Sequence, residues 1–228
     1  MRNLFKVVDV ESTGLDPVTD RIVEIGWCDL LNGKIYGPNS MLVDPGRSIP
    51  PEASAIHHLT DEDVAGAPFL SEVAQMLVED ADAILVAQNN RFDEEFLRPV
   101  IGERTWIDTY RCAIRLYPDA PKHTNQVLRY LLKPEGLVKE LAEPSHRAGP
   151  DAYVTAHILR EMLKIASVEQ LIQWSNEPAL LSKVGFGEHF GKPYADVPPK
   201  YLRWMLTTDM DEDRKFTARH HLGKLGGV

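Results

Sequence analysis

The chain of 228 residues carries 43% apolar side chains and a net charge of −9 at pH 7. This length and composition suit one sizeable domain with a real core, or one domain with a small appendage, and exclude wholesale disorder. No run of 18 or more apolar residues occurs, so we expect no membrane span. The two cysteines, Cys28 and Cys112, lack metal-ligand spacing, so we expect reduced packing side chains in a cytoplasmic protein, or one of the host cytoplasm if the source is viral.

The acidic total argues against a simple basic nucleic-acid binder, but the charge is spread unevenly along the chain. Residues 1–165 hold 17 Lys and Arg against 26 Asp and Glu, whereas residues 166–228 hold eight of each. Within 98–139 the sign reverses, with eight basic residues against four acids. Carboxylates that bind divalent cations are locally neutralised, so the acidic total is compatible with a metal-dependent protein that acts on nucleic acid.

In chain order, the sequence predicts a meander of strands and then strands that alternate with helices. The expected strands are short, apolar and rich in β-branched residues, and Asn32-Gly33 between two of them is a strong hairpin signal. The predicted strands cover 4–10, 21–30, 34–43, 83–88 and 105–109. The predicted helices are short pieces within 50–66, then 69–79, 92–100, a helix that carries Arg111 and Arg115, 124–132 and 149–165. This order predicts an α/β domain with a mixed sheet flanked by helices.

A change in composition near residue 178 indicates a second unit. The segment GFGEHFGKPYADVPPKYLRWML, residues 185–206, is rich in glycine and aromatic residues, unlike the helices before it. We therefore expect a main domain over 1–167, a small C-terminal module over 178–222 and a flexible tail over 223–228.

Asp9 and Glu11 lie two residues apart on the first predicted strand, so both side chains point to the same side of it. Burying two like charges together is costly unless a cation lies between them. Hard carboxylate oxygens suit Mg²⁺ or Mn²⁺. The alternative is a strand end that emerges into solvent, and the spacing by itself does not decide between the two.

Two further carboxylates stand near predicted helix starts. Asp93 follows a strand, an Asn and a Phe, at the kind of sheet edge where ligands bind in open α/β sheets, although helix-start acids also satisfy the macrodipole. Pro150 fits the first turn of the next helix, which places Asp151 on that turn and His146 on the loop before it. These two suit a metal ligand and a general base, with a surface histidine as the simpler alternative.

Three motifs occur together in a characteristic order. They are D-x-E-S-T-G-L beginning at Asp9, N-x-x-F-D ending at Asp93, and H-x4-D from His146 to Asp151. Together with PEASAIHHLTDEDV over 51–64, they resemble the DEDDh 3′–5′ exonucleases of the ribonuclease H-like superfamily, and the resemblance covers nearly the whole chain. It implies a ribonuclease H-like mixed five-stranded sheet flanked by helices, with a small C-terminal extension.

The resemblance also implies a two-metal site and roles for particular residues. Asp9, Glu11, Asp93 and Asp151 would hold two Mg²⁺, with Mn²⁺ able to substitute. His146 would activate the water that releases nucleoside 5′-monophosphates from a DNA 3′ end. The residues expected to contact the substrate are Thr13, Gly14, Leu15, His57, Asn89, Phe92, Arg111 and Arg115.

Some of these contacts have a more specific expectation. Leu15 would press against the terminal base. Arg111 and Arg115 lie one helical turn apart and would contact the strand, with a solvated helix face as the alternative. The aromatic residues of the C-terminal module are interpreted as core rather than as a stacking platform: Phe186, Phe190, Tyr194, Tyr201 and Trp204. The basic residues of the module that could touch duplex DNA are Lys183, Lys192, Lys200 and Arg203.

The expected partner is single-stranded DNA or duplex DNA with a 3′ tail, with no membrane. An enzyme that trims RNA on the same scaffold stays open. A proofreading subunit bound to a DNA polymerase is less favoured, because the C-terminal module resembles the tail of a stand-alone exonuclease. A catalytically inactive binding module is disfavoured because all four acids and the histidine are present. Gln88 stands where many relatives have a histidine, and Arg147 excludes the subgroup that has tyrosine there.

Overall fold

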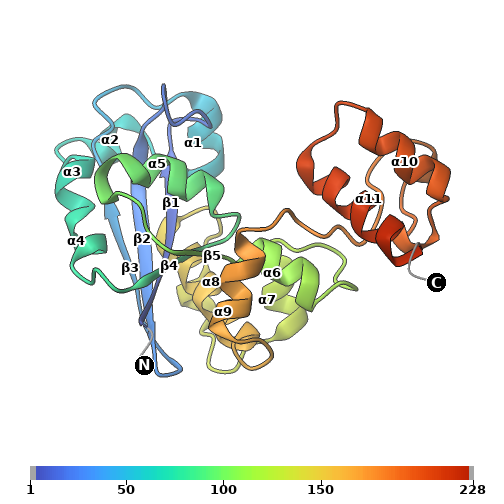
Figure 1. The fold of residues 1–228 in the computed structure, drawn as a ribbon. Coiled ribbons are helices and arrows are strands. Elements are labelled where there is room, and N and C mark those ends of the chain that lie inside the picture. The colour runs from blue at the N-terminus through green and yellow to red at the C-terminus, as the bar shows by residue number, and fades with distance from the viewer. Residues whose placement is uncertain (1–3, 226–228) are drawn as a thin grey trace.

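The computed structural model describes residues 4–225 and confirms the mixed five-stranded sheet. The strands are β1 (Leu4–Ser12), β2 (Ile22–Leu31), β3 (Lys34–Leu42), β4 (Ile84–Ala87) and β5 (Trp106–Asp108). Their order is β3-β2-β1-β4-β5 (Figure 1). The first three strands are antiparallel, and β1, β4 and β5 are parallel. Asn32 and Gly33 both have positive φ, as a two-residue hairpin requires, so this prediction is confirmed.

Helices cover both faces of the sheet. Successive residues of a strand face opposite sides, so Val7 packs in a cluster with Ala113 and Leu159, whereas Val8 packs in another cluster with Leu77 and Leu97. The helices of the main domain are α1 (Pro51–His57), α2 (Asp61–Val64), α3 (Leu70–Val73), α4 (Gln75–Val78), α5 (Arg91–Ile101), α6 (Thr109–Leu116), α7 (Asn125–Leu132), the 3-10 helix η1 (Lys139–Ala142), α8 (Ala148–Met162) and α9 (Val168–Ser175).

Two parts of this pattern differ from the sequence-based expectation. The single helix expected over 69–79 is divided into α3 and α4, and Phe69 lies exposed ahead of α3 with its N–H bonded to the Glu72 carboxylate. The sequence analysis did not assign α9, whose N-terminus is capped by the Ser167 hydroxyl. None of the helices within residues 4–225 combines the length and the apolar character that a bilayer crossing needs.

The helix α8 lies directly against β1, β2 and β3, and it is buried along most of its length. Gly26 of β2 permits this contact. A Cβ built on Gly26 would lie 2.0 Å from the carbonyl carbon of Ala148 and 2.2 Å from the amide nitrogen of Gly149. The first turn of α8 therefore contacts the backbone of β2 directly at Gly26. Asp9 of β1 is the residue that pairs with Gly26 across the two strands.

A small C-terminal unit follows an extended segment after α9 (Figure 1). Its core contains Val184, Tyr194, Leu202 and Met205, together with Ala218 of the last helix. Its elements are η2 (Gly187–His189), η3 (Tyr194–Asp196), α10 (Pro199–Thr207) and α11 (Glu212–Leu225). The helix α11 covers the first three residues of the expected flexible tail, and residues 226–228 lie outside the described residues.

Candidate active site

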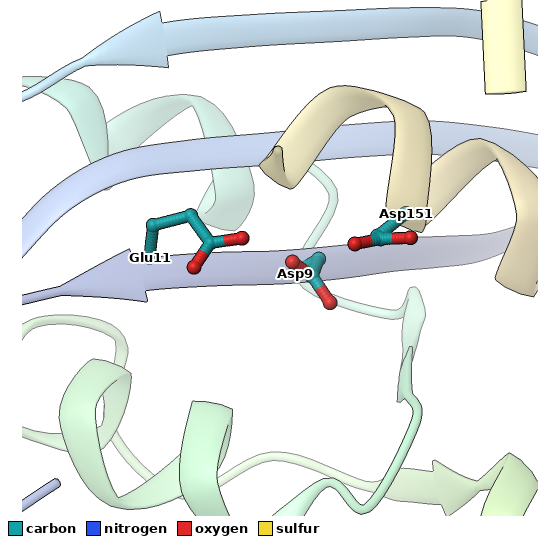
Figure 2. Close-up of side chains that lie close together, drawn as sticks. All are labelled: Asp9, Glu11 and Asp151. Carbon is teal, nitrogen blue, oxygen red and sulfur yellow. The ribbon is translucent and has the colours of Figure 1, made fainter. Parts of the chain in front are cut away.

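Three of the four predicted acids meet at the end of β1. Ligand oxygens of Asp9, Glu11 and Asp151 all lie within 4.8 Å of one another. Figure 2 shows Asp9 and Glu11 on β1 and Asp151 on the first turns of α8, with their carboxylates gathered together. The alternation of the strand places the first two on one side of β1, and the close contact at Gly26 brings α8 and Asp151 to that side.

Asp93, on the helix α5, is the fourth acid of the group. It is buried on the first turn of α5, and its Oδ1 accepts a hydrogen bond of 3.0 Å from the Val10 amide, between Asp9 and Glu11 on β1. Its negative charge is one of the causes that raise the pKa of Asp9. The structure therefore places Asp93 beside the other acids, with one oxygen turned to the strand backbone.

The electrostatics of this group favour a bound cation. Burial is the largest cause that raises the pKa of all four acids, and the charges of neighbouring carboxylates add to it at Asp9, Glu11 and Asp93. The pKa of Glu11 rises to about 8. Like charges crowded in a low-dielectric site are stabilised by a divalent cation, and an all-oxygen donor set suits Mg²⁺ or Mn²⁺. The residues present thus fit the metal site that the motifs predict.

His146 lies on the loop immediately before α8, and its side chain is exposed. Its backbone adopts a left-handed conformation with φ of 61°, and its N–H donates a 2.7 Å hydrogen bond to Oδ2 of Asp151. The backbone is therefore tied to the acidic group while the imidazole points into solvent. Its positive charge, when protonated, acts to lower the pKa of Asp151.

A buried ion pair that the sequence analysis missed supports this loop. Glu24 of β2 is 1% exposed and receives two hydrogen bonds from the Arg147 guanidinium, at 2.8 and 2.9 Å, and others from the Ser40 hydroxyl and the Ala148 amide. Burial by itself would raise the pKa of Glu24, but these donors bring it below its ordinary value. The sequence carries two signals of this ion pair. Glu24 is an acid within an otherwise apolar strand, and Arg147 directly follows His146.

Beside the acids lies a cavity of about 520 Å³, and six predicted substrate residues line it. Leu15 stands at its rim and is 83% exposed, whereas His57 is buried with its Nδ1 accepting the Leu59 N–H. Within residues 4–225, Nε2 of His57 is buried and lacks a hydrogen bond of good geometry, and burial lowers the pKa of this imidazole. The lining residues are Asp9, Val10, Glu11, Ser12, Thr13, Gly14, Leu15, Glu52, Ala53, Ile56, His57, Gln88, Asn89, Phe92 and Asp93.

Gln88, which stands where many relatives have histidine, connects this cavity to the next loop. Its Nε2 donates a 2.6 Å hydrogen bond to the His123 carbonyl, and its Oε1 accepts one from the Thr109 hydroxyl. The amide thus holds the cavity wall in place through both of its polar atoms.

The structure places Arg111 and Arg115 outside this cavity. Arg111 donates to the Glu177 carbonyl and forms an ion pair with Asp108, and Arg115 binds the Glu177 carboxylate and the Pro178 carbonyl. Both guanidinium groups therefore hold the segment that leads from α9 to the C-terminal unit. Their expected contact with a nucleic-acid strand stays a prediction.

The fold and the acidic site are consistent with one class of protein, the exonucleases. The chain belongs to the exonuclease family, whose family model matches residues 7–159. The chain is 34% identical to Exodeoxyribonuclease 10 of Escherichia coli strain K12, over 96% of this chain and 99% of that protein. It is also 32% identical to the DNA polymerase III subunit epsilon of Treponema pallidum, over 70% of this chain and 76% of that protein. These findings confirm the family that the three motifs indicate.

Solved structures agree with this assignment. A structure of exonuclease X in complex with 5′ overhanging duplex DNA is 34% identical and matches with a TM-score of 0.62, over 75% of this chain and 99% of that chain. Exonuclease I of E. coli, in complex with a dA16 oligonucleotide, matches with a TM-score of 0.56 over 75% of this chain and 42% of that chain. At 19% identity, the second match concerns the fold alone.

Proposed function

We propose that this protein is a metal-dependent 3′–5′ exodeoxyribonuclease that releases nucleoside 5′-monophosphates from DNA 3′ ends. The observation that carries the proposal is the meeting of Asp9, Glu11 and Asp151, with Asp93 beside them, at the edge of a cavity of about 520 Å³. Its lining combines the acids with apolar side chains and the His57 imidazole, which suits one terminal nucleotide.

The four acids would hold two divalent cations, Mg²⁺ by preference with Mn²⁺ as a substitute. Two such cations stabilise the charge on the attacking and leaving oxygens of a phosphodiester displacement. The protein's own residues position the substrate. Leu15 at the rim would pack against the terminal base, and Phe92 and the Thr13-Gly14 backbone would line the place of the sugar and base. His57 would line the same place with its imidazole.

His146 would act as the general base, and its imidazole would accept a proton from the attacking water. Its exposed ring is supported by a backbone that is tied to Asp151, so a rotation of the side chain brings the imidazole toward the acids without moving α8. We expect this rotation when substrate and cations are bound. A metal- and substrate-free crystal structure with the imidazole already locked against the four acids would contradict it.

The choice of DNA rests on the relatives. Exodeoxyribonuclease 10 covers almost the whole chain at 34% identity, and the exonuclease X complex contains 5′ overhanging duplex DNA. We therefore propose both single-stranded and duplex 3′ ends as substrates. The likeness to DNA polymerase III subunit epsilon, over 70% of this chain, keeps a polymerase-bound role as the second candidate. The free thiols of Cys28 and Cys112 fit a reducing cytoplasm.

The test is a digest of 3′- and 5′-labelled DNA and RNA oligonucleotides with and without Mg²⁺. We expect mononucleotide release from the 3′ end of DNA that stops in chelator. Asp151→Asn should lower turnover by at least about 10³-fold, since it removes one of the charges that hold the cations. Its melting temperature without metal should not fall, because the raised pKa of Asp151 shows that the fold disfavours the charge.

The exposed acid Asp209 supplies the matched control, and Asp209→Asn should leave turnover unchanged. A fully active Asp151→Asn enzyme would exclude the assignment of this acid. Release from the 5′ end, or turnover that persists in chelator, would exclude the proposed reaction itself. Faster digestion of RNA than of matched DNA would favour the RNA-trimming alternative.

A further inference from the structure

The C-terminal unit carries a row of aromatic rings at the edge of its core, in which Phe186 and Tyr201 are half-buried and Trp204 is exposed. Tyr201 and Trp204 lie one turn apart on α10 with ring centroids 4.9 Å apart, and Phe186 lies 6.4 Å from Tyr201 in a stacked arrangement. Trp204 is 46% exposed. The buried side of α10 is formed by Leu202 and Met205, so the helix packs into the core without the Trp204 ring.

This arrangement differs in part from the expectation that the aromatic residues of the unit form its core. Tyr194 is buried as expected, with 1% exposure. Phe190 and Trp204 are 73% and 46% exposed, so the core interpretation is wrong for these two. Exposed aromatic surface costs free energy in water, and its concentration in a small unit marks a contact surface.

The charge around the row has the sign that nucleic acid requires. Residues 178–225 hold eight Lys and Arg against six Asp and Glu, whereas residues 1–177 hold 17 against 28. Lys200 and Arg203 are exposed next to the two rings on α10, and neither forms an ion pair within residues 4–225. The Arg214 guanidinium lies 5.2 Å from the Phe186 ring at the other end of the row.

Three acids of the C-terminal unit form contacts away from α10. Asp211 is paired with Arg214, and Glu212 is paired with Arg219. Asp213 accepts the N–H of Ala179. These three acids satisfy α11 and the connecting segment, and within residues 4–225 the other three, Glu188, Asp196 and Asp209, form no ion pair with Lys200 or Arg203.

We propose that the surface formed by Tyr201, Trp204, Lys200 and Arg203 binds unpaired single-stranded nucleic acid. Flat rings bind bases by stacking, and neighbouring Lys and Arg side chains bind the phosphates between them. The bases of a duplex are already stacked on one another, so this surface selects an unpaired strand. The binding is independent of sequence because every base presents a flat face.

The connecting segment makes this surface useful to the active site. Arg115 binds Glu177 and Pro178 on the side of the main domain, and Thr217 of α11 accepts the N–H of Leu181 on the other side. A strand bound on the C-terminal unit is thereby tethered to the domain that carries the acids, which raises its effective concentration there. This consequence rests on the proposed function, whereas the binding itself does not.

The test measures binding separately from cleavage. The full chain with Asp151→Asn is titrated with a labelled oligothymidine of about 20 nucleotides and with the matched oligouridine, read by anisotropy. We expect Trp204→Ala to weaken binding roughly 5- to 100-fold, as one lost stacking contact does. Trp204→Phe keeps a ring and should keep most of the affinity. Phe69→Ala removes a ring of the main domain that is 58% exposed, against 46% for Trp204, so it is the matched control and should change nothing.

A second variant and a spectroscopic signal keep the test independent of folding. Lys200→Glu with Arg203→Glu changes exposed side chains only and should weaken binding and flatten its salt dependence. The strand should quench tryptophan emission in the parent protein but much less in the Trp204→Phe variant, since the quenched ring is then absent. The oligothymidine and oligouridine arms show which sugar the surface prefers.

Wild-type affinity in both Trp204→Ala and the Lys200/Arg203 variant would overturn the proposal, and a protein partner would then be the better occupant of the surface. An equal loss in the Phe69→Ala control would overturn it as well. Binding that depends on Trp204 in a protein that cleaves no nucleic acid would reject the proposed function and leave this site standing. Cleavage with Trp204-independent binding would do the reverse.

Discussion

The contact between α8 and β2 at Gly26 yields a sharp test of how the active site is assembled. Gly26→Ala places a Cβ 2.0 Å from the Ala148 carbonyl carbon, 2.2 Å from its oxygen and 2.2 Å from the Gly149 nitrogen. All three atoms belong to the backbone, so no side-chain rotation relieves the overlap. The first turn of α8 must move away from β2.

The size of that movement follows from ordinary contact distances. Carbon atoms pack at about 3.5 Å, so the start of α8 must retreat by roughly 1.5 Å. Asp151 lies on this turn and would leave Asp9 and Glu11 by a similar distance. Metal sites tolerate displacements of about 0.2 Å, and an error of about 1 Å can cost about 100-fold in rate. Overpacking also costs about 1–3 kcal/mol, or roughly 2–12 °C in melting temperature.

We therefore expect Gly26→Ala to lower kcat/KM on a 3′-labelled oligonucleotide by about 100-fold or more at saturating Mg²⁺. Alanine substitutions at two other glycines should lower activity less. A Cβ on Gly149 would lie 3.0 Å from the Ser40 Cβ and 3.3 Å from the Asn39 carbonyl oxygen, a much smaller overlap, and a Cβ on Gly185 would meet nothing within 4 Å. The loss of activity should follow the order Gly26, Gly149, Gly185. A Gly26→Ala enzyme with unchanged turnover and melting temperature would refute the described contact.

The other predictions concern charge. Arg147→Ala leaves the Glu24 carboxylate buried with only the Ser40 and Ala148 donors, so urea unfolding should show a loss of about 2–4 kcal/mol, against about 0.5 kcal/mol or less for Arg91→Ala at an exposed ion pair. Equal losses in the two variants would contradict this. Because the folded pKa of Glu11 is about 8 against 4.5 when unfolded, this group binds a proton more tightly in the fold, so the metal-free melting temperature should fall as pH rises between these values. Glu11→Gln should flatten the fall, added Mg²⁺ should reverse it most near pH 8, and a slope unchanged by Glu11→Gln would reject the explanation.

Local rules were sufficient for much of the framework. The alternation of Val7 and Val8 between the two faces of the sheet, and the hairpin at Asn32-Gly33, follow from strand geometry and the ease of positive φ at these residues. The shared side of Asp9 and Glu11 follows from the same geometry. The sequence by itself therefore determined which residues could serve as ligands and how the sheet begins.

Only the tertiary structure decided how distant segments meet. Asp151 reaches β1 because Gly26 admits the backbone of α8, and Arg147 finds Glu24 from more than a hundred residues away. Arg115, whose contact with a nucleic-acid strand stays a prediction, binds the segment that leads to the C-terminal unit. Such contacts depend on packing and on competition between partners across the whole chain. Local spacing in the sequence carries no information on packing or on competition between partners. The sequence therefore identified the acids but not the contacts that hold them together.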